Sequence, residues 1–244
     1  MALSFSVAAP DPRARRRYVR PPEPLHFPVE EQVPETKLHR LRANLLYEVV
    51  ARAFQGRALV ACDQFVYWDP TDPKKRLAPD LAVRMGAHEG ERLDSWKTWR
   101  LGAPHVGVEI VSDSDESERV LDTKLERYRQ AGILEVVRFD AEDAERPLRL
   151  WDLFDGDLVE RELGRPEALL CDALGLYWCV TRDPELGPAL RLAEDSSCHA
   201  LLPTPAEAER TAKEAERTAK EAALVERDEA LARIAELEAE LRKR

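Results

Sequence analysis

The chain has 244 residues, 34% of them charged, and a formal net charge of −10. This length allows one domain of ordinary size with appendages, and the acidic balance excludes a protein that is basic over its whole surface. A local basic groove can still bind nucleic acid within an acidic protein. Because no apolar run approaches the roughly 18–20 residues that span a bilayer, we expect no membrane partner.

Residues 1–35 are rich in proline and show neither helical nor strand periodicity, which predicts an extended N-terminal extension. A short apolar stretch precedes the arginines at 13–17, which is the reverse of the order in a secretory signal. The cysteines form no CxxC pair; they are Cys62, Cys171, Cys179 and Cys198. We interpret them as reduced thiols and expect a cytoplasmic protein.

Residues 36–202 carry the pattern of one folded domain. Leucine and valine recur at helical spacing after Thr36, which predicts a helix with Thr36 as its N-cap, ending near Gln55 and Gly56. We then expect strands over 58–68, 80–85 and 105–112, a helix over 120–131 that ends at Gly132, and a strand over 133–139. A hairpin follows, with strands over 148–154 and 158–163 joined at Asp155-Gly156.

The composition changes again beyond Pro205. The segment AERTAKE occurs twice in succession, over 208–214 and 215–221, and an apolar stripe continues through Leu231, Ile234, Leu237 and Leu241. Helix formers dominate without glycine or proline, so we expect a helix over 206–244 that pairs as a coiled coil in a homodimer or higher homo-oligomer. The alternative is a solitary charged helix stabilised by local ion pairs.

Three charged residues are candidates for a site: Asp80 in PDLAVRM, Glu109 in HVGVEIVS and Lys124 in VLDTKLERY. Each carboxylate lies in or beside an apolar run, where an ionised group is costly to bury without a partner or a metal. Mg²⁺ or Mn²⁺ is held by a few oxygen ligands, so Asp80, Glu109 and the backbone carbonyl of Ile110 are the candidate metal ligands. A divalent ion with a nearby ammonium suits the hydrolysis of a phosphodiester.

These residues also resemble a known family. PDLAV at 79–83, VEIVS at 108–112, Lys124, Tyr128 and AGILEVV at 131–137 resemble the PD-(D/E)XK nuclease superfamily, and more closely the restriction-endonuclease-like family called Uma-two. The resemblance implies an α/β, restriction-endonuclease-like core, with a mixed central sheet flanked by helices. It also implies that Asp80 and Glu109 hold the metal and that Lys124 is the catalytic lysine, fifteen residues after the glutamate.

The expected function is therefore Mg²⁺-dependent cleavage of DNA by an endonuclease. The candidate DNA contacts are the basic residues nearest the site: Arg92, Lys97, Arg100, Arg119, Lys124, Arg127 and Arg129. Cleavage of RNA is not separated from cleavage of DNA by these residues. The second hypothesis is a non-catalytic interaction scaffold that works through its coiled coil. His39 is interpreted as a packing or hydrogen-bonding residue, Glu48 as a solvated one, and Trp96 and Trp99 as packing residues.

Overall fold

The computed structural model describes residues 25, 27, 36–86, 94–112, 118–161 and 167–242, without the side chains of 118, 119 and 240. The N-terminal extension expected over 1–35 lies almost wholly outside the described residues. A six-stranded sheet has the order β1-β4-β6-β7-β8-β9. Its strands are β1 (Ala58–Ala61), β4 (Leu81–Met85), β6 (Val106–Ile110), β7 (Glu135–Phe139), β8 (Leu148–Phe154) and β9 (Asp157–Glu160).

The central sheet is mixed, as expected. Strands β6 and β7 are parallel and are joined by helix α3 (Glu118–Ala131), whereas the other neighbouring strands are antiparallel. A parallel pair requires a crossover of this kind, and the helix supplies it. The fold class predicted from the sequence, an α/β protein with a mixed central sheet and a long C-terminal helix, is confirmed.

Helix α1 (Lys37–Ala53) lies on one face of the central sheet. Thr36 is its N-cap and accepts a hydrogen bond from the His39 amide, as expected from the sequence. A second sheet of β10 (Ala168–Cys171), β11 (Leu176–Asp183) and β12 (Gly187–Ala193) shares this core. Leu46, Val108 and Trp178 are examples of its fully buried residues.

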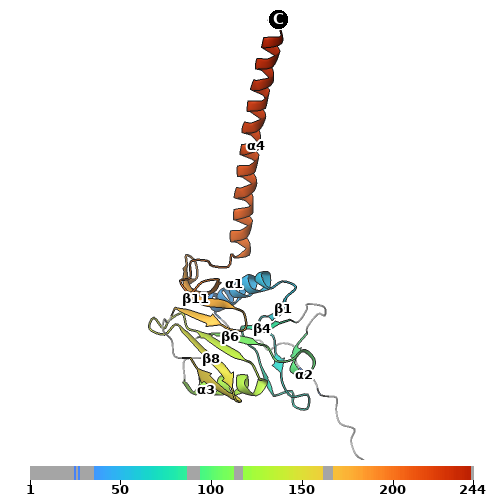
Figure 1. Cartoon of the computed structure of the whole chain (residues 1–244). Helices are drawn as coiled ribbons and strands as arrows, with labels where there is room; N and C mark the ends of the chain where they lie inside the picture. The colour runs from blue at the N-terminus through green and yellow to red at the C-terminus, as the bar shows by residue number, and fades with distance from the viewer. Residues whose placement is uncertain are drawn as a thin grey trace, which may run out of the picture.

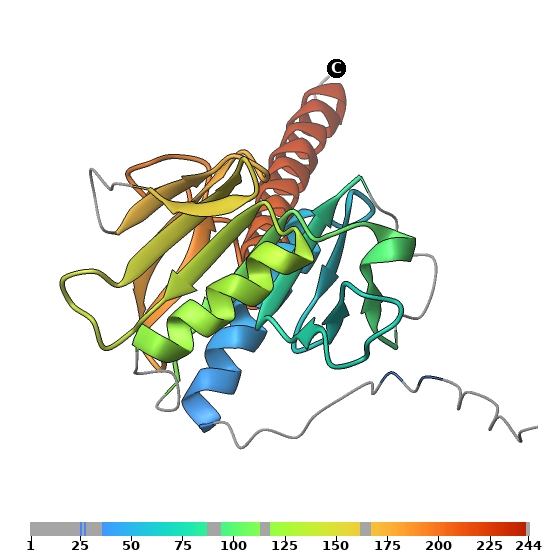
Figure 2. The same ribbon diagram turned by 90° about the horizontal axis from the view of Figure 1, so that it is seen from below.

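Helix α3 covers the opposite face, so the central sheet lies between two helices (Figures 1 and 2). A small sheet of β3 (Arg76–Leu77), β2 (Val66–Tyr67) and β5 (Trp96–Lys97) belongs to this second core, and α2 (Thr98–Leu101) follows β5. Tyr128 of α3 packs so closely over β6 that a Cβ at Gly107 would lie 2.4 Å from its ring. This glycine lets α3 approach the strand that carries Glu109.

The hairpin expected at Asp155-Gly156 is present. Both residues have positive φ angles, of 50° and 87°, and Phe154 pairs with Asp157 across the turn. The strand expected over 58–68 is wrong in its length, because Asp63 takes a φ of 52° and separates β1 from β2. Strands β10 to β12 were not expected at all.

The expectation of four reduced thiols is wrong for two of them. Cys179 on β11 and Cys198, in the loop after β12, form a disulfide although they are 19 residues apart. The fold brings their Cα atoms to 5.9 Å, a separation that a disulfide spans. Cys62 and Cys171 are free thiols.

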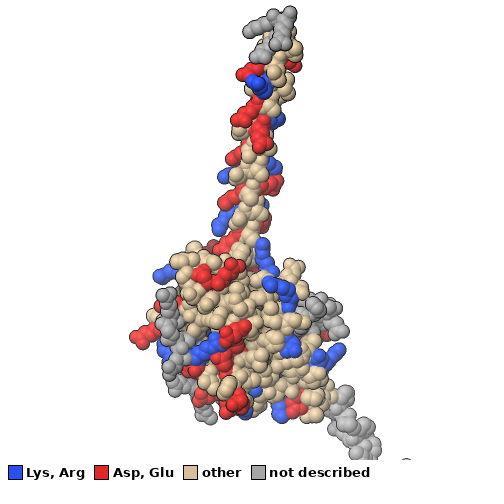
Figure 3. Space-filling view, in the orientation of Figure 1, with Lys and Arg blue, Asp and Glu red and all other residues tan. Residues whose placement is uncertain are grey.

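Helix α4 (Pro205–Arg242) projects away from the domain (Figure 1). The Oγ1 atom of Thr204 accepts from the Glu207 amide, and Glu207 accepts from the Thr204 amide, which is a capping box. Arg191, a buried residue of β12, donates to Glu207 and to the Leu202 carbonyl. Basic and acidic side chains both occur along the helix (Figure 3). No helix in the described ranges is both long and apolar enough to cross a bilayer.

Candidate active site

Asp80 lies directly before β4, where the pairing between β4 and β6 ends. Its Oδ2 atom accepts a hydrogen bond of 2.5 Å from the backbone N–H of Ile110 on β6. Asp80 is only 6% exposed. A carboxylate therefore takes the place of a further sheet hydrogen bond, and it is held against the residue that follows Glu109.

Helix α1 contributes His39 to the same place. Its Nε2 atom lies 2.9 Å from the Ile110 carbonyl oxygen and 3.4 Å from Oδ1 of Asp80. His39 is 5% exposed and belongs to the face of α1 that packs on the sheet. The two backbone polar groups of Ile110 are thus engaged by Asp80 and His39, and all three residues are buried.

Glu109 lies one residue earlier on β6 and meets helix α3. Lys124 Nζ donates to Glu109 Oε2 at 2.7 Å, and the Tyr128 hydroxyl donates to Oε1 at 2.6 Å. Lys124 and Tyr128 are four residues apart, which places them on one face of the helix. Lys124 and Glu109, both expected in the site from the sequence, are therefore in direct contact.

Burial raises the pKa of Glu109 to about 7. The charge of Lys124 opposes this rise, whereas the charge of nearby Asp80 adds to it. A cavity of about 20 Å³, room for about one water, lies beside Glu109 and Lys124. Its walls are largely apolar, and they include Val111, Leu125 and Trp151. Two carboxylates in a poorly solvated place favour the uptake of a positive charge.

The donor set of this site fits a divalent cation. An ionised carboxylate has about four lone-pair sites, and each oxygen of Glu109 accepts one described hydrogen bond. Asp80 and the Ile110 carbonyl add hard oxygen atoms of the kind that Mg²⁺ and Mn²⁺ bind. The structure thus links Asp80 to Ile110 and Lys124 to Glu109, on adjoining residues of β6; their roles stay predictions.

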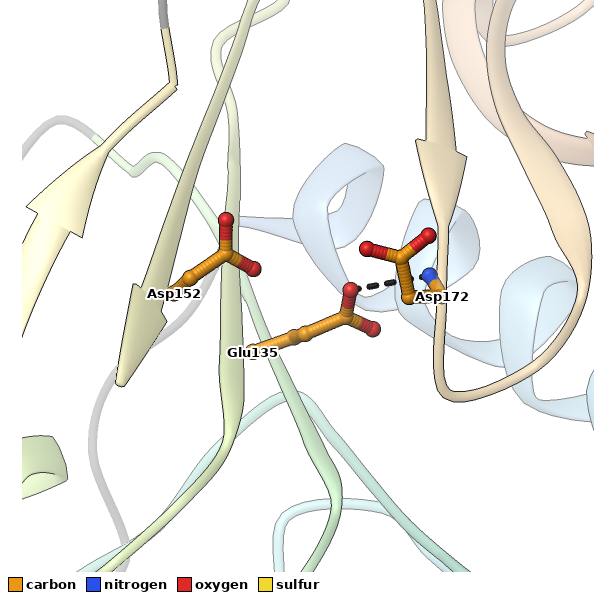
Figure 4. Close-up of side chains that lie close together, drawn as sticks. All are labelled: Glu135, Asp152 and Asp172. Atoms are coloured by element: carbon orange, nitrogen blue, oxygen red, sulfur yellow. Dashed lines mark hydrogen bonds between the residues drawn. The ribbon is translucent and has the colours of Figure 1, made fainter. Parts of the chain in front are cut away.

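A second acidic cluster is drawn in Figure 4, and its Glu135 lies near the end of β6 and β7 that is opposite to Glu109. Carboxylate oxygens of Glu135, Asp152 and Asp172 lie within 4.8 Å of one another, close enough to hold a cation. Arg161 fills this place: its Nη2 atom lies 2.9 Å from Glu135 and 2.7 Å from each aspartate. The guanidinium already supplies the positive charge, so this cluster is an ion-pair network that joins the central sheet to the residue that follows β10.

Other residues singled out in the sequence lie farther from the chemistry. Glu48 is exposed on α1, about two and a half turns beyond His39. Trp96 is fully buried and donates from Nε1 to the Gly102 carbonyl, which agrees with a packing role. Trp99 is 40% exposed.

The expected basic residues that the structure describes have different local surroundings. Lys124 is paired with Glu109, and Arg129 is paired with Glu126. Arg127 lines an open groove that also holds Lys74 and Lys75 and the acidic residues Asp122 and Glu126. Arg92 and the side chain of Arg119 lie outside the described residues. Lys74 and Lys75 were not expected in this surface.

Three contacts of the two acidic centres were missed in the sequence. Tyr128 was noted without its bond to Glu109, and His39 was interpreted only as a packing or hydrogen-bonding residue. The signal for His39 was available, because it is in phase with the buried positions Ala43 and Leu46 of α1. Arg161 had no such signal, since it joins segments that are far apart in the chain.

Comparison with known proteins gives this geometry a context. No curated protein matches the chain. A solved structure from Anabaena variabilis ATCC 29413, described as "a putative nuclease belonging to DUF820", is similar over 64% of this chain and 76% of its own. The identity is 14% and the TM-score is 0.41. The family model Uma2, described as "Putative restriction endonuclease", matches residues 29–183. This match covers more than half of the chain, and the protein therefore belongs to the Uma2 family.

Proposed function

We propose that this protein is a metal-dependent endonuclease that hydrolyses phosphodiester bonds of DNA. The observation that carries the proposal is the 2.7 Å contact between Lys124 and Glu109, next to the residue that Asp80 binds. Membership of the Uma2 family supports a nuclease-like activity. Mg²⁺ or Mn²⁺ is the proposed cofactor, held by Asp80, Glu109 and the Ile110 carbonyl.

Each residue has a distinct part in this proposal. A bound divalent cation would neutralise the charge that develops on phosphate oxygens during hydrolysis. Lys124, whose side chain is 33% exposed, reaches solvent and can orient the attacking water or stabilise the developing charge. Tyr128 is proposed as a positioning residue, because its hydroxyl donates to Glu109 while its side chain is almost fully buried.

We infer that DNA is bound mainly through its phosphates. Arg127, Lys74 and Lys75 line a groove of about 470 Å³ along the outer side of α3. Asp122 and Glu126 lie in the same groove, so its potential is mixed. Contacts of this kind give an affinity that falls steeply as salt rises. Binding to one duplex that stays constant between roughly 50 and 200 mM salt would argue against this surface.

Cleavage of plasmid DNA with Mg²⁺ or Mn²⁺ tests the activity. Lys124→Ala should reduce the rate by about 10²–10³-fold, as expected for a group that stabilises transition-state charge. Lys213→Ala, on exposed helix α4, is the control and should retain the wild-type rate. Equal rates for the two variants would refute the role of Lys124. Single-stranded DNA and RNA, tested in parallel, define the substrate class.

The second candidate is an interaction scaffold, which is favoured by the exposed apolar stripe of α4. Leu231, Ile234, Leu237 and Leu241 are each at least 46% exposed. We propose that α4 pairs with α4 of a second copy as a coiled coil. Leu231→Lys with Leu237→Lys, in the full chain, should then reduce the sedimenting mass. Metal binding without cleavage, together with retained self-association, would favour the scaffold.

A further inference from the structure

The surroundings of Ile110 hold more than the two-carboxylate site described so far. His39 Nε2, Asp80 Oδ1 and the Ile110 carbonyl oxygen converge, with His39 Nε2 at 2.9 Å from the carbonyl and 3.4 Å from the carboxylate. A carbonyl oxygen only accepts hydrogen bonds, so Nε2 carries the hydrogen in this arrangement. One hydrogen thus occupies the place between three potential metal donors.

We propose that His39 is a nitrogen ligand of the metal, so that the site binds Mn²⁺ and similar first-row ions in preference to Mg²⁺. This inference rests on the proposed function, because it assumes a cation at Asp80. When the cation takes the place of this hydrogen, the neutral imidazole carries its hydrogen on Nδ1 instead, and Asp80 and Ile110 are the neighbouring oxygen ligands. An imidazole nitrogen binds first-row transition-metal ions, among which Mn²⁺ stands at the weak end of the affinity order, whereas Mg²⁺ favours oxygen ligands and retains water.

The position of His39 supports this role. It lies in the first turn of α1, whose start is fixed by the hydrogen bond between the His39 amide and Thr36. Its side chain is buried between the helix and the sheet rather than exposed to solvent. A ligand held on a capped helix and locked by packing is already oriented, which lowers the cost of binding.

Spectroscopy of bound Mn²⁺ tests the ligand directly. Electron spin echo envelope modulation of the wild-type protein should show coupling to a histidine ¹⁴N nucleus. His39→Gln should remove this coupling, because glutamine keeps a donor for the Ile110 carbonyl but offers no imidazole. His199→Gln, in the loop after β12, is the matched control and should retain it. Absence of nitrogen coupling in the wild-type protein would overturn the proposal without any variant.

Calorimetric titration measures the preference between metals. His39→Gln should weaken Mn²⁺ binding by at least about tenfold, the low end of what loss of even an outer-shell partner costs. Mg²⁺ binding should change less, so the ratio of the two affinities should fall. Unchanged Mn²⁺ affinity would refute the role of His39.

The same titration separates this inference from the proposed function. Asp80→Ala should abolish binding of both metals. If Asp80→Ala loses the metal while His39→Gln binds Mn²⁺ normally, only the role of His39 fails. If Asp80→Ala still binds Mn²⁺ normally, the proposed metal site itself fails.

Discussion

Glu109, which is partly buried, and Glu135, which is buried, are carboxylates on neighbouring parallel strands, but their surroundings differ. Glu135 accepts hydrogen bonds from the Cys171 thiol, the amides of Asp172 and Ala173, and the Arg161 guanidinium. Glu109, within the described part of the chain, accepts from Lys124 and Tyr128. A carboxylate surrounded by donors stabilises a fold, whereas one with fewer donors and a second carboxylate nearby retains capacity for a cation.

The largest expected effect on stability comes from removing the guanidinium of Arg161. This group lies among Glu135, Asp152 and Asp172, the Glu135 cluster. Arg161→Met leaves three carboxylates close together without their guanidinium, so we expect a loss of about 3 kcal/mol in unfolding free energy. Lys124→Met is the matched change at Glu109 and should cost about 1 kcal/mol or less. The smaller cost is expected because Glu109, with a pKa of about 7, can take up a proton instead. Urea unfolding at neutral pH measures both, and the reverse order would contradict the comparison.

Addition of Mn²⁺ should stabilise the protein through Asp80 and not through the Glu135 cluster. At a free concentration of about 100 times Kd, a ligand that binds only the folded state adds about 2.7 kcal/mol. Asp80→Asn should abolish this gain, whereas Asp172→Asn should retain it. Thermal unfolding with and without metal is the measurement. If Asp172→Asn alone abolishes the gain, the cation binds at the Glu135 cluster instead.

The raised pKa of Glu109 gives a defined pH dependence for the metal-free protein. Between about pH 4.5 and 7 the folded state binds more protons at this residue than the unfolded state. The contribution of Glu109 is therefore most favourable below this window and is lost as the pH rises through it. Relative to Glu109→Gln, the wild-type protein should lose roughly 2–3 kcal/mol across the window. If the unfolding free energies of the wild-type protein and of Glu109→Gln change in parallel with pH, Glu109 is solvated and its pKa is not raised.

The smallest effect concerns thiol reactivity. Burial raises the pKa of the Cys171 thiol, and the charge and hydrogen bond of Glu135 raise it further. Cys62 is only partly buried. Under native, non-reducing conditions an aromatic disulfide reagent should therefore modify Cys62 before Cys171, since the thiolate is the reactive form. Two thiols should react after denaturation; four would argue against the disulfide between Cys179 and Cys198.

Much of the central fold could be predicted because its signals are local. Thr36 as an N-cap, the hairpin at Asp155-Gly156 and the helix that carries Lys124 each depend on residues close together in the chain. The strand over 58–68 was predicted too long. The positive φ of Asp63 separates β1 from β2, and an aspartate alone does not predict that conformation. The turns that join β10 to β11 and β11 to β12 carry signals of the same kind, in Asp183-Pro184 and in Gly175 and Gly187 with positive φ, yet these strands were missed.

The candidate site was predictable in its charges but not in its contacts. Asp80 and Glu109 could be identified because carboxylates are unusual beside apolar strands. The contact between His39 and Ile110 joins residues 71 positions apart, and no sequence spacing encodes such a distance. The same holds for Arg161, whose three carboxylates come from different segments of the fold.

Because the start of α4 is anchored, the length of the helix sets the direction in which its far end presents a bound partner. Because Arg191 and the capping box fix the first turn, the 38 residues form a rod of about 57 Å with a defined rotational phase. Insertion of a single residue would turn the distal apolar stripe by about 100° around the rod and move it by only about 1.5 Å. Deletion of one seven-residue repeat would shorten the rod by about 10 Å and keep the phase nearly unchanged. The direction in which a distal partner is presented is therefore far more sensitive to helix length than its distance is.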